Sequence, residues 1–235
     1  MLSVIIPTLN AEETLPRTLS SLVSAAVSGL VREVIIVDGG STDGTLDIID
    51  ASGAQLLQTP SSRSLQLAKG AAAARHDWML FLRADTVLGA GWDDELANLF
   101  ELIEGGRFRG SEVAGAFRFE LDDFSGAARV MEKLAALRCA LLRLPYGNQG
   151  LLVSRALYRA VGGYREMPVM EDVDLVRRIV KRIGRARFVL FRSAALASPA
   201  RYRRDGFLAR GLRKQARLAL FCLRVPPSFI ARLCG

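Results

Sequence analysis

Short uninterrupted hydrophobic runs alternate, in the first third of the chain, with segments whose apolar residues recur every three or four positions. The runs are typical of strands buried on both faces, and the spaced segments are typical of helices with one buried side. This alternation predicts a parallel, doubly wound α/β sheet. The predicted strands are 2–7, 33–38, 54–58 and 78–82, and the predicted helices lie at about 15–26, from Thr45, and at 64–74.

The second half of the chain is less regular and ends in an amphipathic helix. A turn-rich loop, "PYGNQG" at 145–150, is followed by a predicted strand and helix. The helix predicted at 171–183 has acids in its first turn and bases in its last, as the helix dipole favours. The other predictions are strands at 112–121 and 186–191 and helices at 128–144 and about 207–223.

Candidate binding residues lie at the carboxyl ends of three of the predicted strands. They are Pro7-Thr8, Asp38 and Asp85. Ligands of such sheets bind beyond the carboxyl ends of the strands. The sequence therefore predicts a binding site where these three strand ends meet.

The first candidate motif is "VDGGSTDGT" at 37–45. Its glycines permit close backbone approach, and Asp38 can accept a hydrogen bond from a base N–H or a ribose hydroxyl. The alternative is an ordinary Asp/Gly turn that caps the next helix through Asp43 or Thr45. The spacing matches neither a dinucleotide fingerprint nor a Walker loop.

The second motif is "FLRADT" at 81–86. An acid just past a buried strand can hold a divalent cation, which in turn binds a diphosphate. Asp85 is the candidate metal ligand, with Arg83 beside it. The alternative is a helix-capping Asp-Thr pair.

The third motif is "MEDVDL" at 170–175, which sets Glu171, Asp172 and Asp174 at the start of a helix. Acids there can simply favour the helix N-terminus. Asp172 and Asp174 lie about 200° apart around a helix, so the three acids cannot share one role. Crowded, partly buried carboxylates raise one pKa toward the range of a general base. Either Glu171 or Asp172 can fill that role on these grounds.

Composition limits the alternatives. The 235 residues suffice for one sizeable domain. Three widely spaced cysteines indicate neither a disulfide framework nor a zinc site, and a lone histidine, His76, excludes a histidine metal cluster. The N-terminus lacks a basic region and no segment has about 18 uncharged apolar residues. We therefore expect a cytoplasmic protein without a signal peptide.

Charge is unevenly distributed around the net value of +8. Residues 1–120 carry 9 Lys+Arg and 16 Asp+Glu, and residues 121–235 carry 23 and 8. Residues 201–235 alone hold nine bases and one acid, Asp205. The helix at 207–223 is compatible with an anionic membrane surface, or with packing on the domain with its arginines toward water or a diphosphate. No aromatic platform accompanies the charge, so nucleic acid is not expected.

These motifs, in this order, resemble the family 2 glycosyltransferases, which have the GT-A fold. The resemblance covers about residues 1–205 through "SVIIPTLNAEETL", "EVIIVDGGSTDGT", "LFLRADT" and "MEDVDLVRR". It implies a Rossmann-like doubly wound mixed sheet in one domain, with a nucleotide-sugar half at 1–110, an acceptor and catalytic half at 111–205, and a basic helical tail at 206–235. "AFRFELDD", "PYGNQG" and "RYRRDG" add a resemblance to a bacterial subgroup labelled arsenosugar-biosynthesis-associated glycosyltransferases.

The resemblance implies an inverting transfer of sugar from a nucleotide sugar to a hydroxyl, with Asp172 as base beside Glu171. Asp85 would hold Mg²⁺ or Mn²⁺ against the diphosphate. The acceptor pocket would be bordered by Tyr146, Asn148 and Gln149. The implied nucleotide-sugar residues are Pro7, Thr8, Asn10, Glu12, Asp38, Gly40, Arg63, Lys69, Arg83, Ala84, Asp85 and Arg201.

Three positions depart from the family pattern. Gly39 replaces a second Asp, Arg83 replaces the first acid of Asp-x-Asp, and Asn148 replaces an Asp common in the subgroup. We therefore expect metal dependence that is weaker than usual. A non-catalytic nucleotide-sugar binder is the alternative, while a nucleotidyltransferase would need a glycine-rich loop after the first strand. We expect a UDP-sugar donor, an acceptor that can be lipid-linked, and peripheral contact with an anionic membrane at its inner face.

Overall fold

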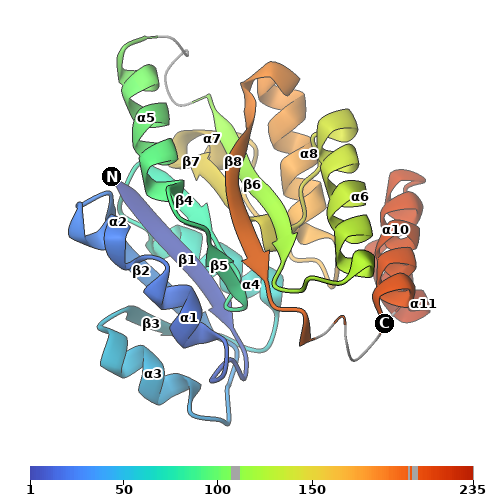
Figure 1. Cartoon of the computed structure of the whole chain (residues 1–235), viewed down its shortest axis with the longest axis horizontal. Coiled ribbons are helices and arrows are strands. Elements are labelled where there is room, and N and C mark those ends of the chain that lie inside the picture. The colour runs from blue at the N-terminus through green and yellow to red at the C-terminus, as the bar shows by residue number, and fades with distance from the viewer. Residues whose placement is uncertain (107–111, 201, 203–205, 235) are drawn as a thin grey trace.

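The strands of the structure form one mixed sheet. The computed structural model describes residues 1–106, 112–200, 202 and 206–234. Within these residues the strand order is β3-β2-β1-β4-β7-β6-β8-β5 (Figure 1). The strands are β1 (Leu2–Thr8), β2 (Val31–Asp38), β3 (Gln55–Gln58), β4 (Trp78–Phe81), β5 (Thr86–Leu88), β6 (Ala114–Leu121), β7 (Leu151–Ser154) and β8 (Phe188–Ala197).

The parallel arrangement predicted for the first half is confirmed, and the second half makes the sheet mixed. Strands β3, β2, β1 and β4 are parallel neighbours. Strand β7 then runs antiparallel to both β4 and β6, while β6 and β8 are parallel. Strand β5 and two helices, α5 and α11, were not predicted from the sequence.

The predicted helices lie at the expected positions, except that one of them is divided into two shorter helices. The segment predicted as one helix at 15–26 is two, and beside the break the hydroxyls of Ser20 and Ser21 donate to the carbonyls of Pro16 and Thr18. The helices are α1 (Leu15–Ser20), α2 (Val23–Val27), α3 (Thr45–Ser52), α4 (Arg63–Ala73), α5 (Trp92–Glu104), α6 (Gly126–Leu142), α7 (Arg155–Ala160), α8 (Glu171–Ile183), α10 (Phe207–Cys222) and α11 (Pro227–Cys234), with 3₁₀ turns η1 (Gly147–Gln149) and η2 (Arg185–Arg187).

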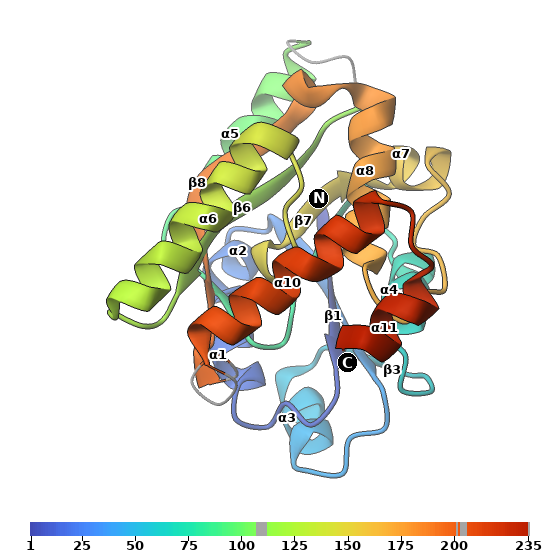
Figure 2. The same ribbon diagram turned by 90° about the vertical axis from the view of Figure 1, so that its right-hand side faces the viewer.

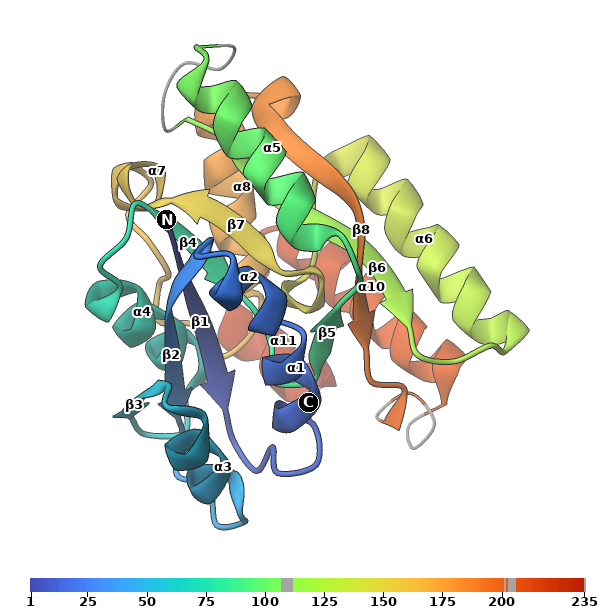
Figure 3. The same cartoon turned by 60° about the vertical axis from the view of Figure 1, so that its left-hand side comes forward.

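Helices cover both faces of the sheet. Helices α1, α2 and α5 lie on one face, where Trp92 and Leu96 are buried (Figure 3). Helices α4, α7 and α8 pack on the other, where Leu67 and Ile179 are buried. Buried apolar side chains from both faces of the sheet account for the doubly wound arrangement.

The C-terminal helices pack on the domain. Helix α10 runs across the structure beside α6, and α11 follows it (Figure 2). Leu218 of α10 and Ile230 of α11 are buried. On α6 the buried residues are Ala128, Ala135, Arg138 and Cys139, while Leu134, Leu137 and Leu141 are exposed. In the part of the chain that the structure describes, no helix is long and apolar enough to cross a membrane.

The strand ends meet as the sequence predicted. Thr8 and Asp38 are direct partners in the β1–β2 register, and the Gly39 amide donates to the Thr8 carbonyl (2.9 Å). The Leu82 amide, just after β4, donates to the Ile5 carbonyl (3.0 Å). The loops after β1, β2 and β4 therefore converge at one edge of the sheet.

Candidate functional site

The first of two adjoining cavities lies at this edge of the sheet, and its volume is about 220 Å³. We call it the edge cavity. Seven of the twelve residues predicted to bind a nucleotide sugar line it: Pro7, Thr8, Asn10, Arg63, Arg83, Ala84 and Asp85. Gln66, which the sequence did not single out, also lines it and donates from Nε2 to the carbonyls of Thr8 (2.7 Å) and Val37 (2.8 Å). Gln66 thereby ties α4 to two strand ends.

Asp38 lies beside the edge cavity but turns into its own loop. Its carboxylate is fully buried and accepts from the amides of Gly40 (2.8 Å) and Ser41 (2.9 Å). Glu12 similarly accepts from the Gly44 amide (3.0 Å). Gly40 has φ +94°, which a glycine adopts without strain. In this structure these residues shape the loop around the cavity.

Of the two remaining predicted residues, one does not line the edge cavity and the other is not among the residues that the structure describes. Lys69 is exposed and donates to the Gln58 carbonyl (2.6 Å). Arg201 lies outside the described residues.

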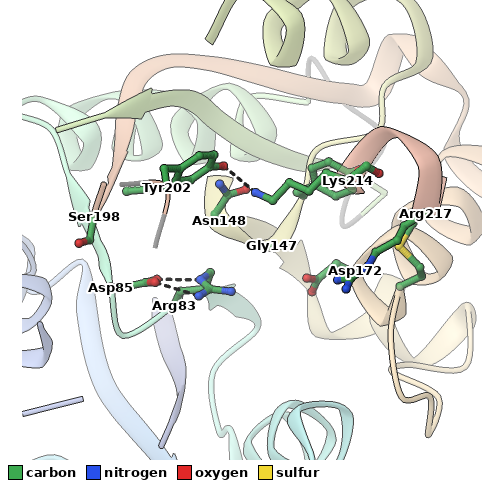
Figure 4. A pocket seen from close by; sticks show the side chains of 12 residues that line it. Arg83, Asp85, Gly147, Asn148, Asp172, Ser198, Tyr202, Lys214 and Arg217 are labelled. Atoms are coloured by element: carbon green, nitrogen blue, oxygen red, sulfur yellow. Dashed lines mark hydrogen bonds and ion pairs between the residues drawn. The ribbon is translucent and has the colours of Figure 1, made fainter. Parts of the chain in front are cut away.

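The second cavity, which we call the base cavity, has a volume of about 150 Å³ and contains Asp172. Arg83 and Asp85 line both cavities, so the two adjoin at this pair. Figure 4 shows Asp172 across the base cavity from Arg83 and Asp85. The residues lining it are Arg83, Asp85, Tyr146, Gly147, Asn148, Met170, Asp172, Ala197, Ser198, Tyr202, Lys214 and Arg217.

Arg63 and Tyr164 hold the Asp172 carboxylate in place. Arg63 Nη2 lies 3.2 Å from Oδ2, and the Tyr164 hydroxyl donates to Oδ1 at 3.2 Å. The same guanidinium contacts Glu171, with Nε 3.0 Å from Oε1. A buried Tyr164 beside this carboxylate has its pKa raised well above the usual value, so it remains a hydrogen-bond donor. Asp172 therefore presents a fixed carboxylate to the cavity.

The three acids of "MEDVDL" have different surroundings, as their helical positions predicted. Asp174 faces away from the base cavity and pairs with Arg178, whose Nη2 lies 2.6 Å from Oδ2. Arg178 also donates to the Gly163 carbonyl (2.7 Å), which ties α8 to the preceding loop. Asp174 is therefore a helix-stabilising acid, and Asp172 is the one that faces the cavity.

Glu171, the first residue of α8, is buried beside Asp172 and Arg63. Burial raises its pKa to about 7, and the neighbouring Asp172 charge adds to the effect while Arg63 opposes it. A carboxyl whose pKa is raised in the folded state stabilises the fold below its ordinary pKa of 4.5, and this contribution is lost as the pH rises through about 7.

We therefore expect the free energy of unfolding to fall between pH 4.5 and pH 7 by on the order of 2 kcal/mol because of Glu171. Urea unfolding at a series of pH values would measure this, and Glu171→Gln should flatten the profile. Glu166→Gln, at an exposed residue of the preceding loop, is the matched control and should leave the profile unchanged. An identical pH profile in Glu171→Gln and the wild type would contradict the assignment.

Arg83 and Asp85 form a bidentate pair. Arg83 Nε and Nη2 donate to the two carboxylate oxygens at 2.7 and 2.8 Å. Partial burial would lower the pKa of Arg83, but the nearby carboxylates, Asp85 first, outweigh this and raise it, so the guanidinium stays charged. Among the described residues, no cluster of three or more His, Cys, Asp or Glu side chains could hold a metal ion. Asp85 is thus a single carboxylate with a fixed cationic neighbour.

Two of the three predicted acceptor residues line the base cavity, and the third does not. Tyr146 and Asn148 are in its lining. Gln149 is buried, accepts from Arg138 Nη2 (3.1 Å) and donates to the Phe117 carbonyl (3.0 Å). Gln149 therefore anchors the 145–150 loop under the site.

Several residues of the base cavity were not predicted, because their positions depend on distant contacts. A Cβ added to Gly147 would lie 2.1 Å from Asp172 Oδ2 and 2.5 Å from Arg63 Nη2. Only a glycine allows the loop to approach this carboxylate so closely. Met170 at the start of α8 has φ +69°, a costly conformation for a non-glycine residue. The lining residues Ala197, Ser198, Lys214 and Arg217, and Tyr164 beside Asp172, were likewise not predicted.

Comparison with known proteins agrees with this arrangement. The family "Glycosyl transferase family 2" matches residues 3–106. A PGL/p-HBAD biosynthesis glycosyltransferase of Mycobacterium bovis is 37% identical over 184 residues, which cover 74% of this chain and 67% of the relative. The chain belongs to glycosyltransferase family 2. It is therefore an enzyme of the transferase class, and the broad resemblance found in the sequence is confirmed.

A second curated relative and two solved structures extend the comparison. The Mycobacterium tuberculosis glucosyl-3-phosphoglycerate synthase is 33% identical over 95 residues, or 37% of this chain and 29% of that protein. Its crystal structure with Mn²⁺ and UDP-glucose has a TM-score of 0.54 at 22% identity, over 84% of this chain and 69% of that one. The structure of S. aureus TarS 1–349 has a TM-score of 0.64 at 18% identity, over 93% and 65%. These likenesses confirm the GT-A fold.

Proposed function

We propose that this family 2 glycosyltransferase transfers a sugar from a nucleotide-diphosphate sugar to an acceptor hydroxyl with inversion of configuration. The observation that carries the proposal is Asp172, a fixed carboxylate in a cavity that adjoins the edge cavity at Arg83 and Asp85. In this proposal the edge cavity holds the nucleotide, and the sugar extends past Arg83 toward Asp172. The half at 1–110 then binds the donor and the half at 111–205 the acceptor.

The proposed reaction is one displacement. The Asp172 carboxylate takes the proton of the acceptor hydroxyl as its oxygen attacks the anomeric carbon. The bond between that carbon and the diphosphate oxygen breaks, and the nucleoside diphosphate leaves with the electron pair. Attack from the face opposite the leaving group inverts the anomeric centre. Arg63 and Tyr164 keep the carboxylate aimed at the cavity.

Mg²⁺ or Mn²⁺ is the proposed cofactor, held by Asp85. Solved structures of glucosyl-3-phosphoglycerate synthase contain these ions with UDP or UDP-glucose. Mg²⁺ sites commonly use one or two carboxylates together with substrate phosphates, and Asp85, which lines both cavities, fits that minimal set. When bound, the cation would offset negative charge on the leaving nucleotide. Arg83 shares this role, because its guanidinium already lies beside Asp85.

We expect metal dependence to be weaker than usual. Activity should survive EDTA treatment in part and rise gradually as Mn²⁺ is added back, because Arg83 supplies a positive charge and competes for Asp85. Arg83→Asn should make the Mn²⁺ requirement stricter. Arg75→Gln, which removes an exposed arginine, is the control. An absolute, tight metal requirement in the wild type would contradict the prediction.

The donor and acceptor are proposals as well. We propose a UDP-sugar donor and an acceptor that is lipid-linked, used at the inner face of the cell membrane. Helices α6, α10 and α11 carry exposed apolar residues, and their sequences contain arginines, a combination that suits an anionic lipid surface. Those residues are Leu134, Leu137 and Leu141 on α6, Leu212 on α10, and Phe229 and Leu233 on α11. The subgroup labelled arsenosugar-biosynthesis-associated remains a proposal that rests on the quoted motifs.

A non-catalytic nucleotide-sugar binder is the second candidate. It is favoured by the Arg83–Asp85 pair, which occupies both carboxylate oxygens that a metal would use. The binder would keep the edge cavity and lack turnover. The buried Glu171 and the clamped Asp172 support catalysis instead.

A donor screen tests the proposed function. Purified protein with Mn²⁺ or Mg²⁺ would be incubated with UDP-, GDP- and dTDP-sugars, and released nucleoside diphosphate would be followed by mass spectrometry. Release from one donor supports the enzyme. Thermal stabilisation by a nucleotide sugar without release, in the presence of candidate acceptors, supports the binder. Neither release nor stabilisation would overturn both.

A further inference from the structure

A third cavity lies on the side of α8 that faces away from the base cavity. We call it the α8–α10 cavity, because it is formed by residues 174–181 of α8 and the last two residues of α10, together with Leu142 and Leu144 at the end of α6. Its volume is about 570 Å³, which exceeds that of either site cavity. None of the described residues that line it also lines the edge cavity or the base cavity. The proposed reaction therefore leaves this cavity without a role.

Part of the lining of the α8–α10 cavity is apolar. Leu144 is buried, and Val180 and Phe221 pack against the same hydrophobic core while remaining partly exposed. Leu142, which ends α6, is 50% exposed, and Leu223, just beyond α10, is 76% exposed. Covering such surface with a hydrocarbon group is favourable, because it removes apolar area from water.

The charged lining residues are three cations and one acid. The acid, Asp174, already pairs with Arg178, whose Nη2 lies 2.6 Å from Oδ2. The two other cations, Arg177 and Lys181, are exposed and lie four positions apart, on one side of α8. Among the described residues, neither of them forms an ion pair. Two positive charges therefore remain at the exposed part of this cavity.

Arg177 connects the charged part of the lining with the apolar part. Its guanidinium carbon lies 5.6 Å from the centre of the Phe221 ring, within the range of a cation–π contact. No described residue accepts a hydrogen bond from its side chain. A guanidinium held beside an aromatic ring, with its N–H groups available, is well suited to phosphate oxygens.

We propose that the α8–α10 cavity binds the phosphate headgroup of an anionic phospholipid together with the start of an acyl chain. Arg177 and Lys181 contact the phosphate oxygens, while Leu142, Val180 and Phe221 contact the chain. The excess of cations selects an anion, and the apolar lining selects an anion that carries hydrocarbon. The cavity is separate from the edge and base cavities, so this inference does not depend on the proposed sugar transfer.

Calorimetric titration of the full chain with dihexanoyl phosphatidylglycerol, kept below its critical micelle concentration, tests the proposal. The wild type should bind this lipid. The double variant Arg177→Gln, Lys181→Gln should bind it about tenfold or more weakly, because two cations near the phosphate are lost. The double variant Arg32→Gln, Arg75→Gln removes two exposed arginines elsewhere on the chain and is the charge-matched control. It should bind as the wild type does.

Cys222 reports whether the lipid occupies this cavity. Its side chain is exposed and lines the cavity, whereas Cys139 is buried. Alkylation of Cys222 by iodoacetamide, followed on its peptide by mass spectrometry, should slow severalfold when dihexanoyl phosphatidylglycerol is added. Dihexanoyl phosphatidylcholine, which has no net charge, should protect it less. The protection should be lost in the variant that lacks both cations of α8.

Four results would overturn the proposal. The first is that the wild type does not bind dihexanoyl phosphatidylglycerol. The second is equal weakening in the two double variants, which would make net charge responsible instead of the cavity. The third is equally tight binding of glycerol 3-phosphate, which would assign the cavity to a soluble phosphate ester. The fourth is full protection of Cys222 in Arg177→Gln, Lys181→Gln. If that variant unfolds, Lys181→Gln against Arg32→Gln gives the same comparison.

Discussion

Asp172→Asn is expected to lower the rate constant of sugar transfer by about 10²- to 10⁴-fold, the usual contribution of a general base. The amide keeps the shape of the carboxylate but cannot take the acceptor proton. The affinity for the nucleotide sugar should be unchanged, because Asp172 lines the base cavity and not the edge cavity. Release of nucleoside diphosphate in single-turnover experiments measures the first quantity, and calorimetry measures the second.

Asp174→Asn is the matched control for this prediction. It changes the same chemical group two positions along α8, on the side that faces away from the base cavity. We expect a lower melting temperature, because the pair with Arg178 is lost, and unchanged activity per folded molecule. Equal loss of turnover in Asp172→Asn and Asp174→Asn would show that the helix start matters as a structural unit and would contradict the base assignment.

Gly147→Ala is expected to reduce transfer by about 10²-fold, since a misplacement of about 1 Å at a reacting group has this effect. The added methyl group would lie 2.1 Å from Asp172 Oδ2 and 2.5 Å from Arg63 Nη2, so both side chains must move. Nucleotide-sugar affinity should change less than turnover, because only Arg63 of this group also lines the edge cavity.

Gly126→Ala provides the control for the substitution itself. A Cβ at Gly126 meets no atom within 4 Å, and alanine favours a helix more than glycine does. Its activity should equal that of the wild type, with equal or higher thermal stability. Full activity in Gly147→Ala would mean that the approach of the 145–150 loop to Asp172 is not needed for the reaction.

The sequence determined most of the elements and the edge where the strand ends meet, because these depend on local patterns, but it did not indicate β5, α5 or α11. Continuous apolar runs define buried strands wherever the chain folds, and the strand ends at Thr8 and Asp38 follow from their lengths. Helix α8 has the predicted bounds, since its acids, its bases and its apolar spacing all agree. The different surroundings of Asp172 and Asp174 likewise follow from helix geometry alone.

Only the tertiary structure decided which partner each functional side chain takes. Both Asp38 and Gln149 belong to motifs that predicted ligand contact. In the structure the Asp38 carboxylate accepts a hydrogen bond from its own loop, and the Gln149 amide donates to the Phe117 carbonyl beneath the site. The approach of Gly147 to Asp172 and the place of Lys214 in the cavity wall join segments far apart in sequence. Hydrogen bonding and charge pairing act over a few ångströms in space, so a one-dimensional pattern fixes where an acid lies but not which neighbours it meets.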